Sequence, residues 1–351
     1  MAELVVAVPP LLRADQAEQR YNEAVQAAVE KCAADTAGQT CFICMDGAAA
    51  EGLVRGCACR GGAGFAHVSC LARQAKILCD EAEDNHLGRD IFNKRWERWH
   101  TCGLCEQKYH GDVKCALGWA CHKTYVGRPE TDWPRRLAMS VLGCGLCGAE
   151  LHEDALSVRE AELSILRRVG APEDHVLCIQ GNLANSYYRL GQGEEALSMY
   201  RDVYSGYSRR LGEQHAMTIA AADNYAMSLI NLRRFDEAKS LSRKTLPVVR
   251  RVFGDDHDTT LRARTIYAAA LYYEDAGATF ADLREAVATL EDTVRIARRV
   301  LGGTHPLTMQ IEDIQQRFRR FNRRVINILW NTISENNRGV ALCYRQFQWK
   351  G

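Results

Sequence analysis

The sequence predicts a mainly α-helical protein in which a small, loop-rich finger precedes an α-solenoid of about four helical hairpins. Two observations predict this fold class. Twelve of the 15 cysteines lie between Cys41 and Cys147, so candidate metal ligands are concentrated in the first part of the chain. From about residue 130 onward, apolar residues recur at helical spacing and short motifs repeat every 42 to 48 residues.

Length, charge and hydropathy indicate a soluble protein of about two domains. The chain has 351 residues, enough for two domains at roughly 150 residues each. Because 45 basic residues face 44 acidic ones, we expect no nucleic-acid partner. No run of 18 apolar residues exists, and the apolar start Leu4 to Val8 has no basic segment before it. We therefore expect a soluble cytoplasmic or nuclear protein without a membrane span or signal peptide.

Residues 1–40 are expected to form an N-terminal helix and linker. Between Arg13 and Lys31, apolar residues recur at roughly helical spacing. The following stretch, Ala33 to Gly38, has the composition of a turn.

Eight candidate metal ligands follow in four close pairs within residues 41–111. The pairs are Cys41-x2-Cys44, Cys57-x-Cys59, His67-x2-Cys70 and Cys102-x2-Cys105. Four protein ligands complete a tetrahedral zinc site and leave no position for a water molecule. The sequence therefore predicts two structural Zn²⁺ ions and disfavours a hydrolytic zinc enzyme, which needs an open coordination position.

The ligand order and spacing over residues 41–105 resemble the RING-CH variant of the RING finger. Arg60-Gly61 directly after Cys59, and Phe65 two residues before His67, add to the resemblance. A PHD finger has a similar ligand order and is the alternative, but its third and fourth ligands usually lie further apart. The RING-CH resemblance implies interleaved sites: Cys41, Cys44, His67 and Cys70 would hold one zinc, and Cys57, Cys59, Cys102 and Cys105 the other.

The same resemblance implies ubiquitin ligase activity, in which the finger binds a ubiquitin-conjugating enzyme and positions its thioester. Ile43 matches the family's apolar contact with that enzyme. Gln74 stands where the family often has Trp. Glu106 stands where many active RING fingers carry a basic residue that clamps ubiquitin.

The segment between Cys70 and Cys102 holds 31 residues, which is longer than usual for the family. It is expected to contain a helix over Val68 to Ala82. Trp96 and Trp99 are expected to pack the finger rather than replace the missing Trp.

Four repeats follow over residues 134–310. Gly170, Gly212, Gly254 and Gly302 are spaced by 42, 42 and 48 residues, and each is followed by a histidine: His175, His215, His257 and His305. Small residues recur in the same way at Ala155, Ala196, Ala238 and Ala286. Two antiparallel helices that cross closely need a position without bulk, so each repeat is predicted to be a helical hairpin. Because the histidines recur once per unit, we interpret them as structural rather than catalytic.

The repeats resemble the tetratricopeptide repeat in the longer form found in kinesin light chains. The resemblance implies a solenoid that binds a protein or peptide ligand. The fourth unit has six extra residues around Ala276 to Ala278, which predicts an enlarged inner turn. We place Ala238 at a helix contact and Lys239, one residue along, on the solvent side.

The remaining segments carry weaker signals. Cys115, Cys121, Cys144 and Cys147 could form a third zinc site, but buried free thiols are the favoured interpretation. Residues 112–133 are expected to form a connecting segment, and 311–335 a capping helix whose arginines could instead meet an anionic partner. Residues 336–351 show no interpretable pattern.

We interpret the chain as a zinc-binding adaptor, and as a soluble RING-type ubiquitin-protein ligase whose repeats recruit a protein substrate. The alternative is a non-catalytic protein-protein interaction scaffold, which Gln74 and Glu106 favour. A chromatin or nucleic-acid reader is disfavoured because the net charge is only +1.

Overall fold

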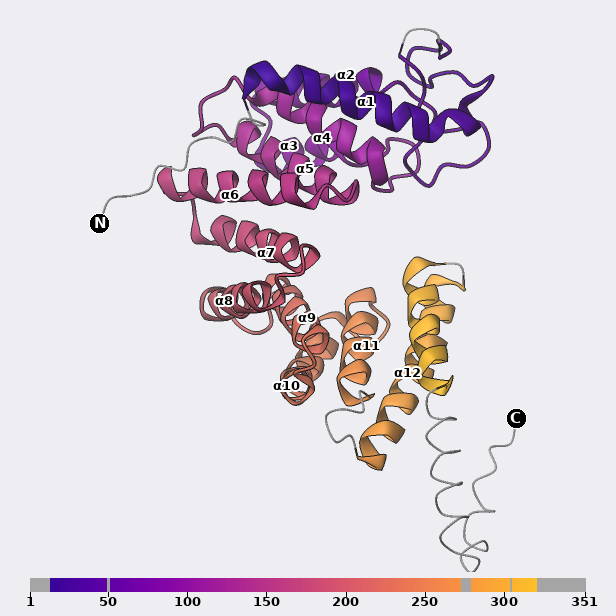
Figure 1. Ribbon diagram of the computed structural model, residues 1–351, viewed down its shortest axis with the longest axis vertical. Helices are drawn as coiled ribbons and strands as arrows, with labels where there is room; N and C mark the ends of the chain where they lie inside the picture. The colour runs from indigo at the N-terminus through magenta and orange to yellow at the C-terminus, as the bar shows by residue number, and fades with distance from the viewer. Residues whose placement is uncertain (1–12, 49–50, 273–278, 304, 321–351) are drawn as a thin grey trace, which may run out of the picture. The chain divides into compact units, whose positions relative to one another are not determined.

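The computed structural model describes residues 13–48, 51–272, 279–303 and 305–320. In these ranges the regular structure is helical, and extended pairing is limited to two isolated bridges, Val54 with Ala66 and Thr101 with Lys108. The chain divides into two compact units at Met199 and Tyr200, within α8. The predicted fold class is confirmed: a finger at the N-terminal end precedes consecutive helix pairs (Figure 1).

The first unit contains the finger and the first helices of the repeats. Its elements are α1 (Ala14–Thr36), α2 (Val68–Asp84), α3 (Arg89–Trp96), the 3₁₀ turn η2 (Glu97–Trp99), α4 (Gly111–Tyr125), α5 (Trp133–Gly148), α6 (His152–Arg168) and α7 (Glu173–Arg189). The helix expected at the N-terminus is present as α1. It continues through Ala33 and Ala34 to Thr36, so the predicted turn begins later, because alanine favours helix more than the turn composition suggested.

The second unit continues the pattern of helical hairpins. Its helices are α9 (Ala216–Asn231), α10 (Phe235–Phe253), α11 (Asp258–Tyr272) and α12 (Phe280–Leu301), and α8 (Gly193–Leu211) contains the boundary between the units. The pairs α5/α6, α7/α8, α9/α10 and α11/α12 are the four predicted hairpins. Within the described residues, no helix is long and apolar enough to cross a bilayer.

A further helix follows α12 over residues 306–320. Residues 311–320 are the described part of the predicted capping helix, so this helix begins five residues before the predicted start at 311. Phe318 is buried, and its ring stacks on Tyr272 of α11 with 3.4 Å between centroids. Arg319 pairs with Glu291 at 3.0 Å. Apolar packing of Phe318 agrees with a capping role. Residues 321–335 of the predicted capping helix, the predicted turn around 276–278, residues 4–8 and residues 336–351 lie outside the described residues.

The repeated glycines and histidines mark the places where one helix ends and the next begins. Gly254 ends α10 with a φ of +84°, a conformation that glycine adopts without steric cost. Three residues later, Nδ1 of His257 accepts a hydrogen bond from the Thr259 backbone N–H at 3.2 Å. Thr260 then donates its hydroxyl to the Gly254 carbonyl at 2.6 Å. The motif therefore stops one helix and caps the start of the next.

The same cap recurs at two other hairpins. His215 accepts from the Met217 N–H and His305 from the Leu307 N–H, both at 3.2 Å. His175 differs, because it lies within α7 and its ring faces Trp133 with 5.1 Å between centroids. The interpretation of these histidines as structural agrees with these contacts.

The recurring alanines are fully buried between helices. Ala155, Ala196, Ala238 and Ala286 all have 0% exposure. The placement of Lys239 on the solvent side was wrong: its side chain is only 22% exposed, and Nζ pairs with Asp282 of α12 at 2.6 Å. The position of Lys239 on α10 alone suggests exposure, but Asp282 from the next hairpin lies against its side chain.

Ala238→Leu should destabilise the full chain by ~1–3 kcal/mol, because the larger side chain must separate packed helices. Ser240→Leu is the matched control, since Ser240 is exposed on the same helix. Thermal unfolding followed by circular dichroism should give a lower melting temperature for Ala238→Leu only. Equal melting temperatures would show that Ala238 is not a packing position.

Residues 112–133, expected to be a connecting segment, include all but the first residue of the deeply buried helix α4. A Cβ added to Gly118 of α4 would lie 3.1 Å from the Leu142 Cα, and one added to Gly145 of α5 would lie 2.8 Å from the Lys114 carbonyl oxygen. The two helix backbones therefore touch through their glycines. Buried side chains from α1, the finger, α4, α5 and α6 form one core cluster, so the first hairpin shares its core with the finger.

A buried polar network lies between α5, α6 and α7. Arg159 of α6 donates from Nη1 to the Asn182 carbonyl at 2.7 Å and to the Ser186 hydroxyl at 2.5 Å. One turn along, the buried Glu162 accepts a hydrogen bond from Ser140 through Oε1, while Oε2 has no hydrogen-bond partner. Burial raises the pKa of Glu162 to about 8, although Ser140 and Arg159 oppose this shift.

The raised pKa of Glu162 makes stability depend on pH. The unfolded chain releases this proton near pH 4.5 and the folded chain near pH 8, so stability should fall between these values by up to ~1.4 kcal/mol per pH unit. Glu162→Gln should remove this contribution and be more stable than wild type at pH 8.5. Urea unfolding from pH 6 to 8.5 tests this, with Glu160→Gln as the exposed control. A wild-type slope retained in Glu162→Gln would contradict the assignment.

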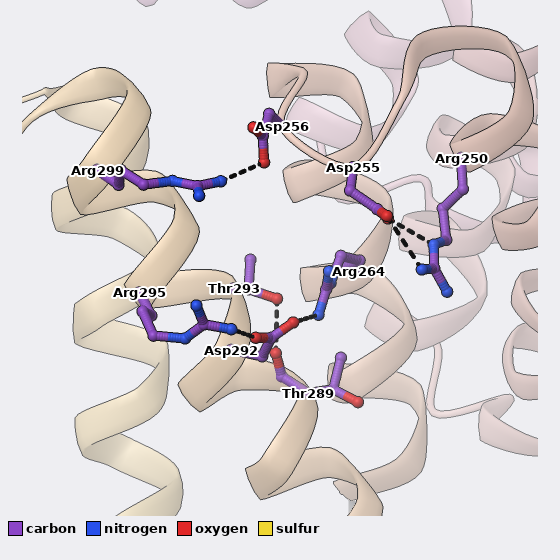
Figure 2. Close-up of polar contacts among 9 residues, drawn as sticks. All are labelled: Arg250, Asp255, Asp256, Arg264, Thr289, Asp292, Thr293, Arg295 and Arg299. Carbon is purple, nitrogen blue, oxygen red and sulfur yellow. Dashed lines mark hydrogen bonds and ion pairs between the residues drawn. The ribbon is translucent and has the colours of Figure 1, made fainter.

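In the second unit, three separate groups of ion pairs lie around α11, the turn before it and α12 (Figure 2). Asp292 of α12 accepts from Arg264 of α11 and from Arg295. In the turn, Asp255 accepts twice from Arg250, at 2.6 and 3.1 Å, and Asp256 pairs with Arg299 at 2.7 Å. Each such pair adds little stability by itself. The Asp256–Arg299 pair joins the turn to α12, and the Asp292–Arg264 pair joins α11 to α12.

Candidate metal centre

The first candidate metal group joins two distant parts of the finger. Cys41 and Cys44 come from a loop, and His67 and Cys70 come from the start of α2, with all four donor atoms within 4.8 Å of one another. His67 Nδ1 lies 3.4 Å from Cys44 Sγ and 3.7 Å from Cys70 Sγ. Nε2 lies 3.0 Å from the Gly47 carbonyl oxygen. A proton on Nε2 would donate to that carbonyl and leave Nδ1 free to bind a metal, the usual arrangement of a histidine ligand.

The second group has the same form with four cysteines. The donor atoms of Cys57, Cys59, Cys102 and Cys105 lie within 4.8 Å of one another, and Cys59 Sγ is 3.8 Å from Cys102 Sγ. Gly64 passes over this group with a φ of +84°, and a Cβ there would lie 2.5 Å from Cys59 Cβ and 3.3 Å from Cys57 Sγ. Only glycine fits between the loop and the sulfur atoms.

Each group includes one Cys-x2-Cys loop, here called a knuckle: the first is Cys41–Cys44 and the second is Cys102–Cys105. The two knuckles have matching backbone hydrogen bonds. In the first knuckle, the N–H of Ile43 points at Cys41 Sγ at 3.4 Å, and in the second, the N–H of Leu104 points at Cys102 Sγ at 3.4 Å. The residue after each second cysteine, Met45 or Glu106, has a left-handed φ of 67° or 56°. Backbone N–H groups aimed at sulfur favour the thiolate form that a metal requires.

The thiol pKa values fit two groups of ligands that bind a cation. Burial raises the pKa of Cys41, but backbone N–H donors oppose it and the resulting pKa is about 7; Cys105 reaches about 7 in a similar way. Burial and neighbouring sulfurs raise the pKa of Cys59 to about 11 and that of Cys70 to about 12. Three or four thiolates this close are stable together only around a bound cation.

Zinc fits these donor sets. Soft sulfur and imidazole ligands in closed groups of four are typical of structural zinc. Because every coordination position is taken by protein, neither group has a place for an activated water molecule. The structure thus brings together the two interleaved sets that the RING-CH resemblance implied.

The other cysteines do not form a third group within the described residues. Cys115 and Cys121 are buried on α4, and burial raises the pKa of Cys115 to about 12. Cys144 and Cys147 lie on α5, a regular helix, where Asn185 donates to Cys147 Sγ at 3.8 Å. Cys115 and Cys121 are therefore buried thiols, as the favoured interpretation expects, whereas Cys144 and Cys147 are only partly buried.

Helices of the long segment between Cys70 and Cys102 support the finger from one side. The predicted helix over Val68 to Ala82 is α2, which continues to Asp84. Trp96 and Trp99 are buried, with ring centroids 5.2 and 5.9 Å from that of Tyr125 on α4. They pack the finger as expected.

Three further residues from the sequence lie on or beside the knuckles. Ile43 is half-buried at the first knuckle, and Glu106 is exposed directly after the second. Gln74 on α2 lies beside the second knuckle, because a Cβ added to Gly103 would be 3.9 Å from its Oε1. Sequence analysis missed Leu104, which is 52% exposed at the second knuckle. Leu104 lies between two ligands, as Ile43 does, and this position could have indicated Leu104 as a second candidate contact residue.

Comparison with known families agrees with this geometry. Residues 41–86 match the model of the RING-variant domain. Residues 179–216 and 218–258 match the model of a tetratricopeptide repeat. No curated protein matches the sequence significantly.

Solved structures similar to this chain include helical repeat proteins. Two are crystal structures of nearly identical TPR-like repeats from a Podosopora anserina putative kinesin light chain, with 18% identity over 66% of this chain and 97% of theirs, and TM-scores of 0.44 and 0.43. Another is BtubC (BKLC) from P. vanneervenii, with 15% identity over 74% of this chain and 92% of that one, and a TM-score of 0.40.

The matched segments and the metal groups together define the class of protein. Repeats of this kind bind proteins, and the finger supplies two closed zinc sites. The protein is a zinc-binding adaptor for protein interactions. Its chain combines a RING-variant domain with tetratricopeptide repeats.

Proposed function

We propose that this protein is a RING-type ubiquitin-protein ligase whose repeats recruit a protein substrate. The observation that carries the proposal is the pair of similar knuckles at Cys41–Cys44 and Cys102–Cys105, the first of which lies in the segment that matches the RING-variant domain. In this proposal the eight ligands hold two zinc ions that fix the knuckles, with the finger over residues 41–111 and the repeats over 134–310. The protein would be a cytoplasmic or nuclear one.

The knuckles present apolar side chains suited to a ubiquitin-conjugating enzyme. Ile43 is half-buried and packs at the edge of the core, so its position is fixed. Leu104 occupies the equivalent place on the second knuckle and is 52% exposed. Apolar residues on rigid loops lose little conformational entropy when they bind a partner. The catalytic contribution would be positioning, since the closed zinc groups supply neither nucleophile nor activated water.

For the substrate, we propose an exposed face of α9, here called the α9 surface. All of its members are exposed and are spaced by three or four residues: Met217, Ala220, Asn224, Met227 and Asn231. Methionine adapts to varied apolar partners, and asparagine amides can pair with a peptide backbone. This combination suits an extended segment of a partner protein.

Ubiquitin-chain formation with a panel of ubiquitin-conjugating enzymes tests the ligase proposal. Wild-type protein should modify itself with at least one enzyme of the panel. Ile43→Ala should lower the rate at least tenfold while keeping both zinc ions. Val300→Ala is the matched control, because Val300 is an exposed apolar residue of α12 outside the knuckles and the α9 surface, so self-modification should stay unchanged.

A second variant tests the effect of Glu106, which differs from the basic residue of many active RING fingers. Glu106 is exposed and follows the last ligand, where many active RING fingers carry a basic residue. Glu106→Arg should therefore raise the rate, because the added cation can clamp ubiquitin while it is transferred. If zinc-loaded wild type and Glu106→Arg are both inactive with every enzyme, the scaffold alternative, favoured by Gln74 and Glu106, replaces the ligase proposal.

A further inference from the structure

An open groove of about 460 Å³ lies between α2 and α3, on the long segment between Cys70 and Cys102. We call it the α2–α3 groove. It is lined by Leu78, Asp90, Ile91, Lys94, Arg95 and Arg98.

The groove exists because α3 and η2 have two different faces. Phe92, Trp96 and Trp99 are buried and join the core of the finger. The residues that line the groove recur at the complementary helical spacing, from Ile91 through Arg95 to Arg98. Ile91 is 48% exposed although it is apolar, so this face is left without a partner in the described part of the chain.

Charge in the groove is predominantly positive. Arg95 is held by the chain itself, because Nη1 donates to Glu81 Oε2 at 3.0 Å and to the Leu78 carbonyl at 3.1 Å. Arg98 donates only to the Cys102 carbonyl, at 3.1 Å, so its charge is not neutralised by an acid among the described residues. Lys94 is exposed and has no ion pair in the same ranges.

We infer that the α2–α3 groove docks a short acidic segment of a partner protein. An aliphatic side chain of that segment would lie over Leu78 and Ile91, and flanking carboxylates would pair with Lys94 and Arg98. Lys94 and Arg98 against the single lining carboxylate, Asp90, favour an acidic ligand, because the charge of Arg95 is already paired with Glu81. The apolar floor favours a peptide over nucleic acid, because no aromatic side chain lines the groove for base stacking. The inference does not depend on ligase activity.

Selection from a displayed library of random eight-residue peptides tests this inference with the full, zinc-loaded chain. Peptides are first selected for binding to wild type. Those that also bind an Ile91→Glu, Lys94→Glu double variant are then removed; both changes are at exposed side chains. Lys76→Glu is the matched control, because Lys76 is an exposed lysine on α2 that does not line the groove.

The enriched peptides should carry one aliphatic residue flanked by two or more acidic residues. A synthetic peptide of the enriched sequence should bind wild type and Lys76→Glu alike and the double variant at least tenfold more weakly. Its affinity should fall as NaCl rises from 50 to 500 mM. Enrichment of neutral or basic peptides, or equal binding to the double variant, would overturn the inference. A labelled single-stranded oligonucleotide that binds the groove more tightly than the peptide would overturn it in favour of nucleic acid.

Discussion

Cys57→Ser is expected to unfold the whole first core, from α1 to α6, and not the finger alone. Cys57 is a ligand candidate in the second metal group and is itself a member of the shared core cluster. The apparent free energy of zinc binding in closed structural sites is about 10–16 kcal/mol, and that energy is folding energy. Because α4 and α5 pack on the finger through this cluster, loss of the ion removes support from both helices.

Hydrogen exchange measured by mass spectrometry should show directly which helices unfold in Cys57→Ser. In Cys57→Ser, backbone amides from α1 to α6 should lose protection, while those of α10 to α12 should keep it because the second unit has its own core. Cys178→Ser is the matched control, since Cys178 is an exposed cysteine outside both metal groups. Exchange changes confined to residues 41–111 would show that the finger folds independently of α4 and α5.

Gly145→Ala is the second change with a large expected effect. The new Cβ would lie 2.8 Å from the Lys114 carbonyl oxygen and 3.1 Å from the Cys115 Cα, both backbone atoms of α4. A backbone cannot rotate away as a side chain can, so α4 and α5 must separate. Overpacking of this kind costs ~1–3 kcal/mol, which exceeds the ~1 kcal/mol that alanine gains over glycine in a helix.

Gly148→Ala on the same helix is the matched control for Gly145→Ala. Its Cβ would meet only Lys114 Cδ at 3.3 Å, near the end of a flexible side chain. Thermal unfolding of the zinc-loaded chain should give a lower melting temperature for Gly145→Ala and an unchanged or higher one for Gly148→Ala. A Gly145→Ala variant as stable as wild type would mean that the two helices do not cross at this glycine.

The metal groups could be predicted from sequence because chelating pairs are local. Two ligands separated by one or two residues can bind the same ion from one short loop, so four such pairs in succession indicate metal ligands. Spacing alone is not enough, because Cys144 and Cys147 have the same spacing as Cys41 and Cys44 but lie on the regular helix α5. The pairing of distant knuckles came from the family resemblance. Gly64 could not be predicted, because its closeness to Cys59 depends on how the loop returns over the metal group.

The hairpins could be predicted because their signals repeat, whereas α4 could not. A helix buried on all sides has no polar stripe, so its sequence lacks the period that identifies a helix. In α4, side chains pointing in different directions, such as Leu117, Trp119 and Cys121, are all buried. The error at Lys239 has a similar cause, because its partner Asp282 lies on another hairpin and leaves no mark in the local pattern.

Metal content measured on the intact protein tests the central claim most directly. Native mass spectrometry of protein purified without chelator should show about two zinc ions per chain, because eight ligand atoms form two closed groups of four. Cys57→Ser should retain at most the ion of the first group, and Cys178→Ser should retain both. A wild-type chain that is folded with no zinc, or that binds a single ion shared by the two groups, would contradict the account.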